Sequence, residues 1–304
     1  MIEHLPVLAD EVTGFVARGP GWYLDATVGG GGHAARLLDA LPAEARLLCL
    51  DRDPAALERA AARLSRYGDR VRLVHAAFDQ LGEVMSAGRL GSLAGALFDL
   101  GLSSLQLGDV SRGFSFARGG VLDLRFDPTQ GRPAWRVLET VDEETLARWL
   151  AAYGEIPAAR RVARAILAAG ARCPLHSTDD VRAAVAPVWG ERPHPRRLAQ
   201  LFQALRIAVN DELPRIERGL AQAAERLEPG AALAVISYHS LEDRIVKRFL
   251  AGAPPTKREA QLGLVPKRPL EPVTRRAVVP KLAEVAANPR AASARLRVAR
   301  RIEA

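Results

Sequence analysis

The chain has 304 residues, 48% of them hydrophobic, which is enough for one large α/β domain with an insertion or for two domains. Two cysteines exclude a disulfide scaffold, and no apolar stretch reaches the length of a membrane span. The N-terminus lacks the basic and apolar regions of a signal peptide, so we expect a cytoplasmic protein. None of the six histidines lies in a metal-ligand spacing, and no metal is predicted.

The positive charge is concentrated near the C-terminus. The formal net charge is +8, and residues 241–304 contain 15 Lys or Arg against 6 Asp or Glu, a net +9, which leaves about −1 for the preceding residues. Such a segment favours a polyanionic partner, most simply nucleic acid, because neutralised phosphates release condensed counterions. A solvated basic surface without a partner is the alternative.

A glycine-rich turn is the first segment whose sequence indicates a binding site. The apolar run 21–24 predicts a strand and residues 34–41 predict a helix; Asp25 begins the segment between them, which contains four successive glycines, 29–32, and then His33. Glycine allows positive φ and close approach of the backbone to a bound molecule, and the free N–H groups at the helix start face that molecule. The turn therefore predicts a ligand site.

Two cofactor classes use such a turn. The spacing Gly29-x-Gly31-x-x-Ala34 fits the dinucleotide fingerprint, and Asp51 lies roughly 20 positions further on, where an acid holds a ribose. Both NAD and S-adenosylmethionine contain that ribose. Asp25 would repel a pyrophosphate, whereas it would attract the ammonium group of a methionine moiety, so the sequence favours S-adenosylmethionine.

The following segments alternate between helix and strand. We expect a strand over 46–50, a helix over 55–67, a strand over 70–76, a helix over 80–90 and a strand over 93–100. This alternation predicts a doubly wound sheet. Phe78 follows the third strand and could pack on adenine, with a core phenylalanine as the alternative, and Asp99 ends the fourth strand.

The middle of the chain changes character. Residues 101–127 are polar, glycine-punctuated and aromatic, which is typical of a working loop rather than of a core element. Phe114 and Phe116 could stack on a base or pack within the protein. From 134 to 208 the pattern is helical, with breaks at Gly154, at Pro174 and around 187–195, which predicts a helical insertion in the sheet domain.

The sheet resumes after the insertion. We expect a helix over 210–227 that ends at 228–230, a strand over 231–237, a helix over 241–250, a proline- and charge-rich loop over 252–274, and last strands over 276–279 and 294–302. The run Tyr238-His239-Ser240 marks the carboxyl end of a strand. There, His239 could contact RNA or act as a hydrogen-bonded structural residue.

Nine short runs, in order and over nearly the whole chain, carry a resemblance. They are HLPVL from His4, DATVGGGGH from Asp25, LDRDP from Leu50, DLGLSS from Asp99, RGFSF from Arg112, YGE from Tyr153, FQALRIAVNDEL from Phe202, ISYHSLEDRIVKRF from Ile236 and NPRAASARLR from Asn288. Together they resemble the bacterial 16S ribosomal RNA cytosine-N4-methyltransferases, also called MraW-like. The chain departs from that family at Leu105 and Gly108, where proline and aspartate are usual, at Ile156-Pro157-Ala158, where Glu-Arg-Phe is usual, and at Leu124 and Phe126, where methionines are usual.

The resemblance implies a fold, a cofactor and a reaction. The fold would be a class I, Rossmann-like α/β methyltransferase: a doubly wound sheet core over 1–102 and 208–304, with an inserted all-helical domain over 103–207 for RNA or substrate recognition. The enzyme would use S-adenosylmethionine to methylate N4 of a cytidine in the decoding centre of 16S rRNA, within the small ribosomal subunit. By motif, the cofactor contacts would be Gly31, Gly32, His33, Asp51, Phe78, Asp99 and Gln106. Asp99 is also the candidate catalytic residue, either activating N4 or only holding the cofactor.

Two other functions stay open on the sequence: a methyltransferase of another RNA or DNA base or of protein, and an NAD-dependent oxidoreductase. The target base must be unstacked or lie in a loop, because a methyl donor cannot reach bases inside an A-form helix. The sequence does not indicate whether naked RNA or an assembled subunit is the substrate. Nor does it indicate the oligomeric state, with a homodimer left open.

Overall fold

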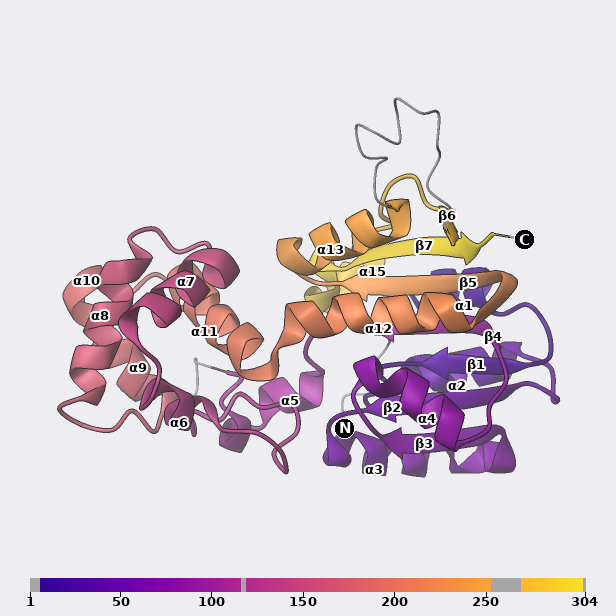
Figure 1. Cartoon of the computed structure of the whole chain (residues 1–304), viewed down its shortest axis with the longest axis horizontal. Helices are drawn as coiled ribbons and strands as arrows, with labels where there is room; N and C mark the ends of the chain where they lie inside the picture. Colours follow the sequence, from indigo (N-terminus) through magenta and orange to yellow (C-terminus); the bar gives the residue numbers. More distant parts are fainter. Residues whose placement is uncertain (1–5, 116–118, 253–268, 303–304) are drawn as a thin grey trace. The chain divides into compact units, whose positions relative to one another are not determined.

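The computed structural model describes residues 6–115, 119–252 and 269–302, and the chain divides into two compact units. Unit 1 consists of Met1–Gly101 and Leu213–Ala304, and unit 2 is Leu102–Glu212. Unit 1 contains the sheet and unit 2 is helical (Figure 1). Three expectations fall partly or wholly outside the described residues: His4 and Leu5 of the first run, Phe116, and most of the loop 252–274.

The described part of unit 1 contains a seven-stranded sheet. Its strands are β1 (Trp22–Asp25), β2 (Arg46–Asp51), β3 (Val71–His75), β4 (Leu93–Asp99), β5 (Leu227–Ser237), β6 (Leu270–Pro272) and β7 (Arg295–Arg301). Their order is β3-β2-β1-β4-β5-β7-β6; β7 is antiparallel to β5 and β6, and the other neighbours are parallel. The strand order reverses between β1 and β4, the point at which doubly wound sheets bind ligands beyond the carboxyl ends of their strands.

Helices cover both faces of this sheet. They are α1 (Ala9–Val16), α2 (Gly32–Ala40), α3 (Pro54–Leu64), α4 (Leu81–Ala87), α12 (Glu212–Arg226), α13 (Ser240–Ala251) and α15 (Leu282–Ala287), with short 3-10 turns η1 (Ser65–Arg70), η2 (Phe78–Gln80) and η4 (Pro289–Ser293). Leu47 and Cys49 pack in the core formed with α1, α2 and α3, whereas Leu48 and Leu50 pack in the core formed with α4, α12 and α13. Burial on both faces explains why β2 reads as an unbroken apolar run.

Unit 2 has a separate helical core. Its elements are α5 (Ser104–Gly108), η3 (Val110–Arg112), α6 (Ala134–Leu138), α7 (Glu143–Gly154), α8 (Ala159–Gly170), α9 (Thr178–Ala184), α10 (Ala186–Trp189) and α11 (Pro195–Asn210). Leu150, Ile166 and Leu201, from three of these helices, are fully buried together. None of the described helices in either unit is long and apolar enough to cross a bilayer.

Two expected boundaries near the return to the sheet were wrong. The expected helix over 210–227 is interrupted at its start, because Asp211 adopts a left-handed φ of 51° that ends α11 before α12 begins. The expected break at 228–230 lies inside β5, whose first residue Leu227 pairs with Leu93. The register between β4 and β5 shifts between the pairs Leu93–Leu227 and Gly95–Ala232, so Pro229-Gly230 lies at an irregularity of the strand rather than in a loop.

The expected strand over 276–279 was also wrong. Only an isolated bridge joins Val278 to Leu296. The edge of β7 is instead paired by β6, at the end of the segment that was expected to be a loop. The other expected strands, including the last one as β7, are present with small shifts at their ends.

Candidate active site

Three aspartates lie at one edge of the sheet. Asp25, Asp51 and Asp99 are the last residues of β1, β2 and β4. Because β1 lies between β2 and β4, the three carboxyl groups are neighbours at the point where the strand order reverses. The charges of Asp99 and Asp51 both raise the pKa of Asp25. A ligand that carries positive charge would be stabilised here.

Asp25 is the most deeply buried of the three. Its side chain is 1% exposed, and its Oδ1 accepts a hydrogen bond from the backbone N–H of Thr27 at 3.2 Å. Within the described residues, Oδ2 is buried without a hydrogen-bond partner. Burial raises the pKa of Asp25 to about 7, although the charge of His33 opposes this shift. A buried acceptor that lacks a donor is unfavourable, so this oxygen suits a ligand's N–H group.

Asp51 is held by the backbone on both sides. Its Oδ2 accepts from Gly29 N–H at 2.8 Å and its Oδ1 from Asp53 N–H at 2.9 Å. Burial raises the pKa of this carboxyl group to about 6, against the effect of these hydrogen bonds. Each carboxylate oxygen has a second acceptor site, so Asp51 can still accept ribose hydroxyl groups in a fixed orientation.

The glycines of the turn differ in what surrounds them. Gly29 and Gly31 have φ of 51° and 77°, which a side chain disfavours. A Cβ at Gly31 would lie 3.3 Å from Leu64, and one at Gly32 would lie 3.3 Å from Pro6, whereas one at Gly30 would meet no atom within 4 Å. A side chain at 31 or 32 would therefore crowd Leu64 or Pro6, and the open space lies beside Gly30.

The turn also presents the start of a helix. Helix α2 begins at Gly32, and the first N–H groups of a helix have no intrahelical acceptor. The N–H of Gly31 is already bonded to the carbonyl of Val28 at 2.8 Å. The predicted cofactor contacts of Gly31 and Gly32 stay predictions, and they would be made by backbone atoms.

His33 and Asp99 are neighbours. The ring of His33 is 7% exposed; its Nε2 lies 2.8 Å from the carbonyl of Val7, and its Nδ1 lies 3.4 Å from Oδ2 of Asp99. The hydroxyl of Tyr238 donates to Oδ1 of Asp99 at 2.8 Å. The N–H of Asp99 donates to Oγ1 of Thr27 at 2.7 Å. The His33 side chain is thus directed at Val7 and Asp99, and its contact with a cofactor stays a prediction.

Sequence reasoning assigned no role to Tyr238 or Thr27. Tyr238 directly follows β5, the strand next to β4, so its place at a carboxyl strand end was the available signal. Thr27 lies within the turn, two residues before the first of the four glycines. His239, by contrast, acts structurally, since its Nδ1 accepts from the N–H of Glu242 at 3.3 Å and caps α13.

Phe78 and Gln106 have packing partners in their own units. The Phe78 ring meets the Phe98 ring edge-on at 5.6 Å between centroids, and a Cβ at Gly219 of α12 would lie 2.5 Å from it. In unit 2, Gln106 is 7% exposed, and its Oε1 accepts from Ser103 N–H at 3.0 Å. The roles of Phe78 at adenine and of Gln106 at the cofactor stay predictions.

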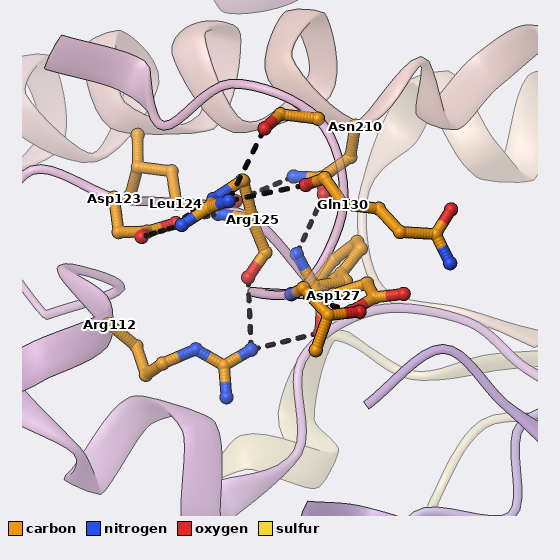
Figure 2. Close-up of polar contacts among 10 residues, drawn as sticks. Arg112, Asp123, Leu124, Arg125, Asp127, Gln130 and Asn210 are labelled. Atoms are coloured by element: carbon orange, nitrogen blue, oxygen red, sulfur yellow. Dashed lines mark hydrogen bonds and ion pairs between the residues drawn. The ribbon is translucent and has the colours of Figure 1, made fainter. Parts of the chain in front are cut away.

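In unit 2, two side chains hold one short segment of backbone (Figure 2). Arg112 donates from Nη2 to the carbonyls of Arg125 and Phe126 at 3.0 and 2.9 Å. Asn210 accepts from Phe126 N–H at 2.8 Å and donates to the carbonyl of Leu124 at 2.7 Å. These bonds fix Leu124, whose φ is 61°, in a conformation that leucine rarely adopts.

The same loop is less available to a substrate than its composition indicated. Leu122 and Leu124 are buried in the core of unit 2, and Phe114, 7% exposed, stacks on Phe126 at 5.6 Å. Arg125 forms a two-pronged ion pair with Asp123 at 2.8 and 2.7 Å. The expectation that residues 101–127 form a working loop rather than a core element was therefore wrong for Leu122, Leu124 and Phe114. Of the two alternatives for Phe114, the structure shows packing within the protein.

The departures from the family pattern fit their surroundings. A Cβ at Gly108 would meet no atom within 4 Å, so neither glycine nor aspartate is excluded there. Ile156 is buried in the core of unit 2, where the usual charged or polar residue would need a partner. Leu124 and Phe126 occupy the packed loop described above.

The C-terminal arginines are partly structural. Arg297 on β7 forms a two-pronged ion pair with Asp243 of α13 at 2.8 and 3.0 Å, and that pair is mostly buried. Arg301 donates to the carbonyl of Ala224. Arg295 is exposed. The basic excess of the C-terminal segment is thus only partly available to a polyanion.

Unit 2 carries a second group of arginines. Arg196 and Arg197, in the first turn of α11, and Arg192, just before that helix, are exposed. The guanidinium of Arg197 lies 5.9 Å from the ring centre of Trp189. Exposed arginines beside an aromatic ring are typical of surfaces that contact RNA phosphates and bases.

Comparison with known proteins gives matches over nearly the full length of the chain. The MraW methylase family matches residues 1–302. Proteins named ribosomal RNA small subunit methyltransferase H are similar: that of Thermomicrobium roseum is 46% identical, covering 98% of this chain and 94% of its own length, and that of Heliobacterium modesticaldum is 43% identical, covering 99% of each. The corresponding protein of Acidothermus cellulolyticus is 48% identical, covering 99% of this chain and 94% of its own length.

Proposed function

Because this chain belongs to the MraW methylase family, we propose that it is an S-adenosylmethionine-dependent methyltransferase of small-subunit ribosomal RNA. The relatives that share 43–48% identity with it are named ribosomal RNA small subunit methyltransferase H. We propose further that the target atom is N4 of a cytidine in the decoding centre of 16S rRNA, as the nine motifs imply, and that the enzyme acts in the cytoplasm.

The observation that carries the proposal is the buried Asp25 oxygen beside the glycine turn. Oδ2 of Asp25 has no partner within the described residues, and it would accept a hydrogen bond from the ammonium of the methionine moiety. Asp51 would accept the ribose hydroxyls, and the open space beside Gly30 would admit the cofactor. When bound, S-adenosylmethionine supplies a methyl group on a positively charged sulfur.

An NAD-dependent oxidoreductase fits this edge of the sheet less well. A pyrophosphate carries negative charge, and it would lie close to Asp25 and the two neighbouring aspartates. A methyltransferase of another base remains the second candidate, because the cofactor residues alone do not select the methyl acceptor.

We propose that Asp99 acts on the acceptor amine rather than only holding the cofactor. The lone pair of the cytosine amine is delocalised into the ring, so the amine is a weak nucleophile. A fixed carboxylate that accepts a hydrogen bond from N4–H favours the nucleophilic form and aligns it for attack. Asp99 ends β4 beside Asp25, and its side chain is held by His33 and Tyr238.

We assign unit 2 to RNA recognition and unit 1 to the cofactor. The exposed Arg192, Arg196 and Arg197, the last of them beside Trp189, support this division. Arginine side chains pair with phosphates, and arginine and tryptophan side chains both stack on bases.

The decisive experiment maps modified nucleotides in 16S rRNA from cells with and without the gene. One N4-methylated cytidine in the decoding centre should disappear in the deletion strain and return with the wild-type gene. An unchanged modification pattern would refute the proposed substrate. Calorimetry with S-adenosylhomocysteine and with NAD tests the cofactor separately, and binding of NAD alone would favour the oxidoreductase.

A further inference from the structure

Both carboxylate oxygens of Asp99 face a side chain from another element. Tyr238, which follows β5, donates to Oδ1 at 2.8 Å, and His33 on α2 places Nδ1 3.4 Å from Oδ2. The main chain of Asp99 is fixed as well, by its bond to Oγ1 of Thr27. All of these residues belong to unit 1, so their arrangement does not depend on unit 2.

The partner of His33 Nε2 determines where protons lie on the ring. A backbone carbonyl can only accept, so the contact between Nε2 and the carbonyl of Val7 at 2.8 Å requires a proton on Nε2. A neutral imidazole carries one N–H, and its Nδ1 would then turn a lone pair toward Asp99 Oδ2. A second proton on the ring turns this repulsion into an ion pair.

Other carboxyl groups lie near the His33 ring and near Tyr238. Asp25 from β1 interacts with the charge of His33, and Asp51 from β2 interacts with Asp25, so the ring faces an anionic edge. Near Tyr238, the carboxylates are Glu242 of α13 and Glu284 of α15. Burial and the charge of Asp99 raise the pKa of the Tyr238 phenol, which therefore keeps its proton and remains a donor.

We propose that His33 is an imidazolium paired with the Asp99 carboxylate, and that His33 and Tyr238 are positioning residues which hold Asp99 as an anionic hydrogen-bond acceptor. This inference rests on the proposed function for the identity of the donor, the target amine. With both oxygens engaged, Asp99 orients the amine without taking its proton. When bound, S-adenosylmethionine would supply the methyl group and leave as S-adenosylhomocysteine, the electron pair of the broken carbon–sulfur bond staying on sulfur. The amine nitrogen would gain the methyl group and release one proton to water.

The protonation of His33 can be measured without any cofactor or RNA. Proton–nitrogen correlation spectra of the histidine rings, recorded on the ligand-free full-length protein at pH 7, report which ring nitrogens carry protons, and His33→Gln assigns the resonances. We expect protons on both nitrogens of His33 in the wild type. In Asp99→Asn, which removes the charge, we expect a proton on Nε2 alone. An unprotonated Nδ1 in the wild type overturns the ion pair.

The positioning role is tested by Tyr238→Phe, which removes one hydroxyl. Single-turnover methylation at saturating S-adenosylmethionine should slow by about tenfold or more, the usual effect of losing a hydrogen bond to a charged group. S-adenosylhomocysteine affinity and melting temperature should change little. The pH profile of the rate should shift, because Asp99 loses a donor that stabilises its charge.

Tyr67→Phe is the matched control, since the Tyr67 hydroxyl bonds to Asp39 and to the carbonyl of Ala35 rather than to the site. Equal rates and pH profiles in the wild type and Tyr238→Phe would overturn the positioning role. A wild-type protein that methylates no rRNA would defeat the proposed function, while the histidine spectra would still decide the ion pair.

Discussion

If Asp25 binds the cofactor's ammonium as proposed, cofactor binding should depend on pH. Its pKa is raised to about 7 by burial, and only the ionised form offsets the charge of the cofactor's ammonium. Between about pH 5.5 and 7.5 that ammonium stays mostly charged, so S-adenosylhomocysteine affinity should rise with pH by up to about tenfold per unit. Asp25→Asn should bind more weakly at the upper end and show a flatter profile in calorimetry. Identical profiles would remove Asp25 from the site.

The same residue should affect stability in the opposite direction. The unfolded chain releases the Asp25 proton near pH 3.8, whereas the folded chain keeps it to about 7. This contribution to stability is therefore complete below the unfolded pKa and is lost as the pH rises through the folded value. As the pH rises from about 5.5 to 7.5, the melting temperature of ligand-free Asp25→Asn should therefore fall less than that of the wild type. The pKa of Asp51 is also raised, so Asp51 lowers stability with rising pH in the wild type and in Asp25→Asn alike.

The glycine turn should separate stability from binding. Gly31→Ala places a Cβ 3.3 Å from Leu64 at a φ of 77°, so we expect a loss of about 1–2 kcal/mol in the free energy of unfolding. Gly30→Ala enters open space and should leave stability nearly unchanged while weakening S-adenosylhomocysteine binding. Denaturant titration and calorimetry measure the two effects. Unchanged affinity in Gly30→Ala would place the cofactor elsewhere.

The loop of unit 2 should depend on Asn210. Asn210→Ala removes the side chain that bonds to the N–H of Phe126 and to the carbonyl of Leu124. Each buried group that loses its hydrogen bond costs about 1–3 kcal/mol of stability. We expect a lower unfolding free energy and faster amide hydrogen exchange at Phe126. The side chain of Gln130, in the same loop, is exposed and labelled in Figure 2, and Gln130→Ala is the control that should behave as wild type. Equal exchange in the two variants would contradict the anchoring role.

The net charge of +8 should not be uniformly available to RNA. Replacing Arg196 and Arg197 with glutamine should weaken binding to small-subunit rRNA and reduce the slope of log affinity against log salt by about 0.7–0.9 per lost phosphate contact. The matched control replaces Arg160 and Arg164, which are also exposed but paired with Glu143. A slope reduced equally by both double variants would mean that overall charge, rather than this surface, attracts RNA.

The fold class and the meeting of three aspartates at one edge of the sheet could be predicted from the sequence, because both follow from local patterns. Strands buried on both faces read as unbroken apolar runs, and in a doubly wound sheet their carboxyl ends meet at one edge, which brought Asp25, Asp51 and Asp99 together. Only the tertiary structure determined the partners of single atoms: Tyr238 and His33 on Asp99, and Asn210 on the backbone of Leu124 and Phe126. These partners lie far apart in the chain. Which oxygen receives which donor depends on the packing of whole helices and strands, and no sequence spacing encodes that.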